Sequence, residues 1–360
     1  MSSYPAISVS DFKSFKRCRR KWDYSSRHRR NLTSEKPQKA LYLGSGVHKA
    51  LETFYNEETD ADMVDTFLQW AQEEKQSIIE AQPADLWQDE IDELDDAIDL
   101  GVGMLKHYKK WASKDDSNYF DKTLLVEQPF LVPIYTRKGT RAHCNFYGII
   151  DGLVQDQYGA YWVHEFKTAA QLDAKNLELD EQAVGYMYAA KQLWDVDCAG
   201  IIYTILRKKT PTVPRELKNG GISIAKNIAT TYDVYYDTLV EYYGSDDEIP
   251  MDRYEEILEI LEEQENPFFK RERVRKTKAE VTEFGERLYD MYRDMLSDPR
   301  IYPNPTNDCS WDCWFKEVCV QQSDGADFER TLDRLFEKST REREVDKALT
   351  VDEAKISQIK

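Results

Sequence analysis

The stretch GIIDGLVQDQYGAYWVHEFKTA (148–169) places three charged side chains in segments that otherwise resemble buried strands. Its pattern predicts two strands joined by a tight turn at QDQYGA. Glu165 and Lys167 are two positions apart and share one face of a strand, while Asp151 lies across the hairpin. Two adjacent carboxylates require a metal ion or a proton, and a nearby ammonium can orient water or stabilise negative charge. The pattern therefore predicts a metal-dependent catalytic site, with a structural Glu–Lys pair on an exposed strand as the alternative.

Four of the six cysteines form a second pattern. Cys309, Cys313 and Cys319 are clustered, and Cys18 stands far from them in FKRCRRKW. In a chain whose N-terminal residues lack an apolar signal segment, clustered cysteines indicate metal ligands rather than disulfides. Zinc and an iron–sulfur cluster both accept four thiolates, so the spacing leaves both open.

The net charge of −18 argues against a generally basic nucleic-acid binder, but the positive residues are concentrated in two tracts. Residues 13–30 contain nine Lys or Arg and one acid, and residues 270–278 contain six and one. Lys and Arg neutralise phosphates directly, so two such tracts indicate a phosphate-bearing ligand, with two ordinary solvated faces as the equal alternative. The basic side chains expected to contact DNA are Arg17, Arg19, Arg20, Lys21, Arg273, Arg275 and Lys276.

Helical and strand patterns surround these residues. Ser10 is expected to cap a helix that carries Phe12, Phe15 and Trp22. Further helical patterns cover 46–56, 61–82, 85–113, 180–194, 230–264 and 277–297, with Pro83 between the second and third. Strands are predicted at 123–135, 142–156, 160–168 and 199–209. A loop is expected at 211–226, and the charged tail after residue 325 is expected to be an exposed helix with a frayed end.

The order of three strands, a helix and a fourth strand predicts an α/β (α+β) fold with a mixed central sheet flanked by helices. The stretch GSGVHK lacks the spacing of a phosphate-binding loop, so nucleotide hydrolysis is not expected. No run of 18 apolar residues exists, so no membrane span is expected. The predicted segments are a basic N-terminal helix (1–40), a helical region (41–122), a core (123–210), a helical and basic region (211–300), a cysteine segment (301–325) and a charged tail (326–360).

The acidic hairpin resembles the PD-(D/E)XK nuclease superfamily, with Asp151 as the first acid and Glu165-Phe166-Lys167 as the E-x-K element. More narrowly, the chain resembles the RecB-like branch, which includes CRISPR-associated (Cas-four-type) and phage-encoded exonucleases. GSGVHKALETFY supplies the helical histidine of that branch, His48. QAVGY supplies its Q-x-x-x-Y helix, with Gln182 and Tyr186 on one helical face. The resemblance extends from about residue 8 to residue 319 and implies a restriction-endonuclease-like core.

The resemblance also implies the cofactors. His48, Asp151, Glu165 and the backbone carbonyl of Phe166 would hold Mn²⁺ or Mg²⁺, and Lys167 would serve the attacking water. Relatives in this branch carry one cysteine ahead of the core and three behind it, which bind a 4Fe–4S cluster. Cys18, Cys309, Cys313 and Cys319 match this order, although three residues rather than two separate the first pair of the triplet.

The expected function is metal-dependent DNA exonuclease activity on single strands or DNA ends, in recombination, repair or DNA processing. Gln182 and Tyr186 are expected to help hold the strand or Lys167. Two alternatives stay open: a nuclease subunit that needs a separate helicase or recombinase partner, and a non-catalytic DNA-binding scaffold held by a Cys₄ metal. A cytoplasmic location in a bacterial or phage-infected cell is expected, and the sequence leaves the oligomeric state open.

Overall fold

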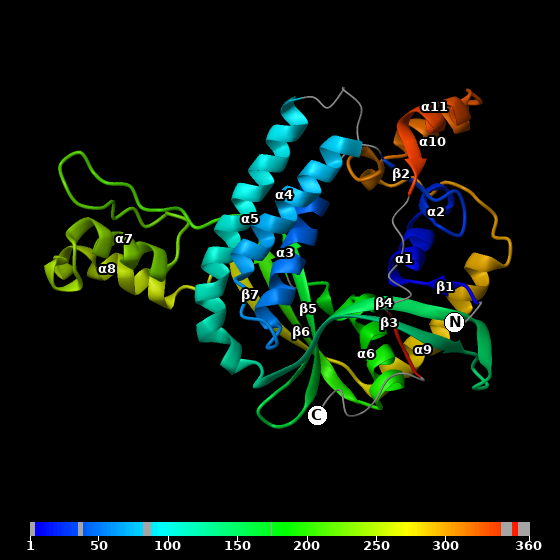
Figure 1. Ribbon diagram of the computed structural model, residues 1–360, viewed down its shortest axis with the longest axis horizontal. Coiled ribbons are helices and arrows are strands. Elements are labelled where there is room, and N and C mark those ends of the chain that lie inside the picture. The colour runs from blue at the N-terminus through cyan, green and yellow to red at the C-terminus, as the bar shows by residue number, and fades with distance from the viewer. Residues whose placement is uncertain (1–3, 35–38, 82–87, 174, 340–347, 352–360) are drawn as a thin grey trace.

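The computed structural model describes residues 4–34, 39–81, 88–173, 175–339 and 348–351. A mixed sheet lies at its centre, with strand order β7-β6-β5-β4-β3-β9 and with β1 pairing β4 outside this path (Figure 1). The β3–β4 and β4–β5 pairs are antiparallel and the β5–β6 pair is parallel, so the predicted mixed sheet is confirmed. Its strands are β1 (Ala6–Ile7), β3 (Lys122–Tyr135), β4 (Arg141–Gln155), β5 (Tyr161–Ala169), β6 (Cys198–Arg207), β7 (Phe269–Arg275) and β9 (Leu349–Thr350).

A tight turn sets the register of the predicted β4–β5 hairpin. Asp156 Oδ1 accepts hydrogen bonds of 2.9 Å from the N–H groups of both Tyr158 and Ala160. Gly159 adopts a φ of 80°, a left-handed conformation that favours glycine. The strands then pair without a shift from Gln155 opposite Tyr161 to Gly152 opposite His164.

Helices cover both faces of the sheet. Successive side chains of a strand point to opposite faces, so each strand contributes to two cores. On one face, Trp162, Phe166 and Ile202 belong to a core formed with α3 (Lys39–Tyr55), α4 (Met63–Ala81) and α5 (Gln88–Asp115). On the other, Val163 and Ile201 pack into a core with α1 (Val9–Arg17), α6 (Glu181–Trp194) and α9 (Lys278–Leu296). The predicted Pro83 break lies outside the described residues.

The first helix begins earlier than predicted and is interrupted. Ser8, rather than Ser10, caps α1: its hydroxyl accepts from the N–H of Asp11, and the Asp11 carboxylate accepts from the N–H of Ser8. Cys18 adopts an extended conformation, ends α1 and caps α2 (Arg19–Ser25). Phe12, Phe15 and Trp22 are buried, as their spacing predicts.

One prediction for the region 211–300 is wrong. The helical pattern over 230–264 divides into α7 (Tyr232–Tyr243) and α8 (Met251–Glu263), because Gly244 takes a φ of 91° and Pro250 follows. These helices form a small core of their own, seen at the left of Figure 1 away from the sheet. The basic tract from residue 270, for which no strand was predicted, forms most of β7, which pairs antiparallel with β6.

The C-terminal region packs against the N-terminal region. It contains α10 (Lys316–Asp324), α11 (Phe328–Leu335) and β8 (Phe336–Lys338), and β8 pairs with β2 (Leu32–Ser34). Leu332 and Phe336 are buried, so the described part of the tail is more than an exposed helix; residues 340–347 and 352–360 lie outside the described residues. Single 3₁₀ turns are η1 (Asp116–Asn118), η2 (Leu177–Leu179), η3 (Asp246–Glu248) and η4 (Asn307–Ser310). No helix in the described ranges is long and apolar enough to cross a bilayer. The six-segment division stays a prediction.

Candidate active site

Three acidic residues form a row across the central strands. One step beyond the pair Gly152–His164, the register places Asp151 opposite Glu165. On the other side of β4, the pairs Val126–Gly152 and Gln128–Ile150 place Glu127 opposite Asp151. The side chains of Asp151 and Glu165 are buried, with 7% and 1% of their surface exposed. Buried neighbouring carboxylates need compensation by cations, protons or hydrogen-bond donors.

Lys167 provides part of this compensation. Its Nζ lies 2.5 Å from Glu165 Oε1 and 3.4 Å from Asp180 Oδ2. Asp151 Oδ2 accepts a 2.9 Å hydrogen bond from the backbone N–H of Phe166, which fixes the hairpin acid to the E-x-K strand. Glu165 Oε2 is buried and has no hydrogen-bond partner among the described residues. One oxygen of Glu165 is therefore available to a further positive ligand.

His48 approaches the same acids from α3. Its Nδ1 lies 3.5 Å from Glu127 Oε1 and 3.7 Å from Asp151 Oδ2. The ligand atoms of His48, Glu127 and Asp151 all lie within 4.8 Å of one another. The ring also meets Phe166 edge-on, with 6.0 Å between centroids. Phe166 in turn stacks on Tyr55 of the same helix, which explains how α3 is held against β5.

The crowding of acids shifts the pKa values of these groups. Burial raises the pKa of Asp151, which His48 opposes and Glu127 reinforces. Burial likewise raises the pKa of Glu165, and the neighbouring Asp151 adds to this. Burial alone would lower the pKa of His48, but the Asp151 and Glu127 carboxylates raise it to about 9. Burial would also lower the pKa of Lys167, yet Glu165 and Asp180 raise it above its usual value. Without a metal, this site therefore holds protons at neutral pH.

The predicted Q-x-x-x-Y pair lies beside these acids on α6. Gln182 Nε2 donates a 2.8 Å hydrogen bond to the hydroxyl of Tyr186, one helical turn on. Burial raises the pKa of Tyr186, and the carboxylates of Glu165 and Asp151 add to the shift. Tyr186 therefore stays a neutral hydroxyl next to the acidic row.

The donor set fits a divalent metal ion. Carboxylate oxygens are the preferred ligands of Mg²⁺, and an added imidazole also suits Mn²⁺. His48, Glu127 and Asp151 present such atoms together, and the unpartnered oxygen of Glu165 lies on the adjacent strand. The ligand role of the Phe166 carbonyl stays a prediction.

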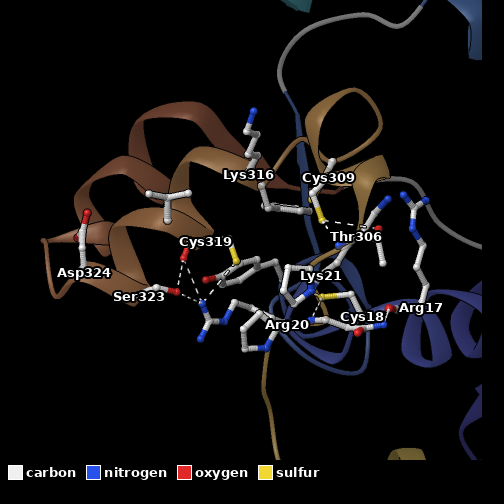
Figure 2. Close-up of a pocket in the computed structure, with 17 residues that line it drawn as sticks. Arg17, Cys18, Arg20, Lys21, Thr306, Cys309, Lys316, Cys319, Ser323 and Asp324 are labelled. Atoms are coloured by element: carbon white, nitrogen blue, oxygen red, sulfur yellow. Dashed lines mark hydrogen bonds between the residues drawn. The ribbon is translucent and has the colours of Figure 1, made fainter.

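The four predicted cysteine ligands line one cavity of about 460 Å³ between the N- and C-terminal segments. Cys18 lies between α1 and α2, Cys309 in η4, Cys313 in the following loop and Cys319 in α10. Figure 2 shows Cys18 on one wall of this cavity, with Cys309 and Cys319 on the wall formed by the C-terminal segment. No three cysteine sulfurs in the described part of the chain lie within 4.8 Å of one another.

Several N–H groups point at these sulfurs. Cys18 Sγ accepts from the backbone N–H of Asn304 at 3.4 Å, and Cys309 Sγ accepts from that of Thr306 at 3.4 Å. The Arg20 guanidinium donates to Cys319 Sγ at 3.4 Å. Hydrogen bonds of this kind are common at metal-bound sulfurs, so they fit a metal site at this cavity.

The predicted DNA-contacting residues divide between two places, and their side chains already contact protein groups. Near the cysteine cavity, the basic residues contact polar groups of the C-terminal segment. Arg17 pairs with Asp308 and Asp312, and Arg20 donates to the Ser323 hydroxyl. Arg19 donates to the carbonyl of Arg300, and Lys21 donates to the carbonyl of Asp312. At β7, Arg273 donates to the carbonyl of Asn118, Arg275 lies over Trp162, and Lys276 pairs with Glu280. Their DNA-binding role stays a prediction.

Two residues of the site escaped the sequence analysis. Glu127 lies in β3 with a φ of 44°, which is unusual for a residue other than glycine. Asp180 caps α6 and faces Lys167, and its place directly before the Q-x-x-x-Y helix was the available signal. Glu127 had no comparable local signal, because its neighbours lie on other strands.

The comparisons with known proteins agree with this geometry. Residues 6–320 match the family model of the PD-(D/E)XK nuclease superfamily, which covers the acidic row, Lys167, His48 and the four cysteines. No curated protein sequence matches the chain. Nucleases of this superfamily use divalent metals such as Mg²⁺ or Mn²⁺, and the mixed sheet flanked by helices is consistent with their restriction-endonuclease-like fold. The chain therefore belongs to the PD-(D/E)XK nuclease superfamily.

Proposed function

We propose that this nuclease is a divalent-metal-dependent DNA exonuclease of the RecB-like branch, acting on single strands or DNA ends. The observation that carries the proposal is the row Glu127–Asp151–Glu165, in which Asp151 and Glu165 are buried, with Lys167 against one end and His48 against the other. Buried acids cost stability, so a site that concentrates them favours a catalytic function over a structural one. The helical histidine and the Gln182–Tyr186 pair support the RecB-like branch.

In this proposal, Asp151, Glu165, His48, Glu127 and the Phe166 carbonyl hold Mg²⁺ or Mn²⁺. The bound metal would acidify a water and polarise the phosphodiester. Lys167 is held between two carboxylates as an ammonium, so it orients the attacking water and stabilises the negative charge that develops on the phosphate. Tyr186 adds a neutral hydroxyl beside the acids.

The cysteine cavity is proposed to hold a 4Fe–4S cluster with a structural role. A tetrahedral zinc site, with Zn–S bonds of about 2.3 Å, holds its sulfurs only about 3.8 Å apart. The four cysteines line one cavity of about 460 Å³ between the N- and C-terminal segments. That shared cavity and the match to the cysteine order of the cluster-bearing relatives support the cluster, and a Cys₄ zinc site stays the alternative.

DNA is the proposed partner, bound by the basic residues near the cavity and on β7. The same site would serve a nuclease that depends on a separate helicase or recombinase, and the alternative of a non-catalytic Cys₄-metal scaffold leaves the buried acids unexplained. We propose a pathway in recombination, repair or DNA processing because the chain resembles the RecB-like branch. No single contact among the described residues supports one of these pathways.

The experiment is degradation of end-labelled single- and double-stranded DNA with Mg²⁺ or Mn²⁺, comparing wild type with Lys167→Ala. Lys191→Ala, on the outer surface of α6, is the matched control. We expect Lys167→Ala to lose about 10²–10³-fold in rate while Lys191→Ala retains activity. Release of mononucleotides from one end supports an exonuclease, and internal cuts in circular DNA contradict it. Binding of DNA without cleavage under either metal favours the scaffold or the helicase-dependent subunit.

A further inference from the structure

Asp180 connects three parts of the molecule through one carboxylate. Its Oδ1 accepts from the backbone N–H of Gln182 at 3.1 Å and from the Lys13 ammonium at 3.0 Å. Its Oδ2 faces the Lys167 ammonium at 3.4 Å. The Asp180 side chain is only 11% exposed, so its contact with Lys167 is largely shielded from solvent, whereas the Lys13 side chain is 44% exposed. The two oxygens therefore have separate partners: Oδ1 contacts the Gln182 N–H and Lys13, and Oδ2 contacts the E-x-K lysine, Lys167.

Lys167 depends on this contact because its other partner is a proposed metal ligand. Glu165 Oε1, at 2.5 Å, would pull the ammonium toward the metal position, and Asp180 Oδ2, at 3.4 Å, provides a second carboxylate that is not a proposed metal ligand. A cavity of about 470 Å³ opens beside Lys167, Lys13 and Asp180, so packing alone does not confine the flexible lysine side chain. A charged partner on the cavity side limits its freedom.

We infer that Asp180 is a positioning residue for the nuclease reaction, which holds the Lys167 ammonium in place and is itself anchored by Lys13 of α1. The inference rests on the proposed nuclease function. Through Lys13 and Asp180, the position of the Lys167 ammonium depends on α1, the helix that ends at Cys18.

Asp180→Asn separates a positioning role from a helix-capping role. Asparagine caps helices about as well as aspartate, so α6 keeps its N-terminal hydrogen bond and only the charge is lost. Glu181→Gln is the matched control, because Glu181 is the next residue and pairs with another α1 lysine, Lys16, but not with Lys167. Single-turnover cleavage of end-labelled DNA and DNA affinity are measured together.

Because small misplacements of a reacting group can cost about 100-fold, we expect Asp180→Asn to cut the single-turnover rate by at least about tenfold, with DNA affinity unchanged. Asp180→Glu restores the charge and should recover most of the rate. Lys13→Gln should lower the rate by at most about fivefold, since an exposed ion pair contributes little. A wild-type rate in Asp180→Asn, or equal losses in Glu181→Gln, would overturn the inference.

A second readout does not need cleavage. Acetylation of lysines by an N-hydroxysuccinimide ester, quantified by mass spectrometry, should label Lys167 at least about twofold faster in Asp180→Asn than in wild type or Glu181→Gln. Unchanged labelling of Lys167 contradicts the inference whether or not the protein cuts DNA. If wild type cuts no DNA but labelling rises in Asp180→Asn, the contact holds and the proposed nuclease function fails.

Discussion

Glu127 lies directly opposite Asp151 on the neighbouring strand, and its Oε1 reaches to 3.5 Å from the His48 ring. This relationship predicts that Glu127 is a metal ligand. Glu127→Gln keeps the size of the side chain and removes its charge, so the affinity for Mg²⁺ or Mn²⁺ should fall by about 10–100-fold. Isothermal titration calorimetry with Mn²⁺ measures this without DNA. Glu178→Gln, an exposed acid on η2, is the control, and an unchanged affinity in Glu127→Gln would show that Glu127 is not a ligand.

The proton on His48 predicts how stability changes with pH. The pKa of His48 is about 9 in the folded protein, against about 6.5 in an unfolded chain. Its stabilising contribution is therefore fully present below pH 6.5 and is lost as the pH rises through 9. The raised pKa values of Asp151 and Glu165 act in the same direction. We expect the metal-free Tm to fall between pH 6.5 and 9.

Mg²⁺ should reverse this trend, because the cation replaces the protons of the site. The rise in Tm on adding Mg²⁺ should therefore grow with pH over the same interval. Differential scanning calorimetry in matched buffers, with His48→Gln as the comparison, checks both statements. If wild type and His48→Gln show the same pH dependence without metal, His48 does not hold the proton.

The cysteine cavity predicts an iron chromophore in protein purified without oxygen. Cys309→Ser should lose iron and visible absorption and should lower Tm, because the proposed cluster would join the two terminal segments. Cys198→Ser, which lies outside this cavity, should retain both. Metal analysis that finds one zinc ion and no iron would replace the cluster with a Cys₄ zinc site.

Arg271 is predicted to stabilise the fold rather than to bind DNA. Its guanidinium is fully buried, lies 2.9 Å from Asp115, pairs with Asp116 and donates to the Tyr55 hydroxyl at 2.7 Å. Removing one partner leaves buried charges uncompensated, so Arg271→Met should lower the free energy of unfolding by about 3–5 kcal/mol. Urea denaturation measures this loss. Arg273→Met, whose side chain is exposed on the same strand, should change it by less than about 1 kcal/mol.

The hairpin acids were predictable because the register is unbroken. Counting outward from the turn, with Gln155 opposite Tyr161, places Asp151 opposite Glu165, as the structure has it. The same count fails for β3 and β4. Their pairing starts with Tyr135 opposite Arg141, which would place Glu127 opposite residue 149, but a bulge after Pro133 shifts the register by two. No local pattern marks that bulge, so the third acid of the row required the structure.

The β7 strand was missed for a different reason. Its sequence, FKRERVR, lacks the alternation of apolar and polar residues that indicates a strand. Arg271 occupies a buried position that would normally hold an apolar side chain. The compensating groups come from α3, α5 and η1, which are distant in sequence. The break between α7 and α8, by contrast, was readable from Gly244 and Pro250.

The cavity lined by Cys18 and the C-terminal cysteines also imposes an order on biosynthesis. Cys18 is synthesised before the strands β3–β7 of the central sheet, whereas the wall that carries Cys309, Cys313 and Cys319 is synthesised after them. The β2–β8 pairing is delayed in the same way. The N-terminal segment must therefore wait for its partners, and the cavity is completed only after the strands of the central sheet have been synthesised. A truncated chain lacks this closure, so premature termination yields a protein whose first helix has no C-terminal wall to pack against.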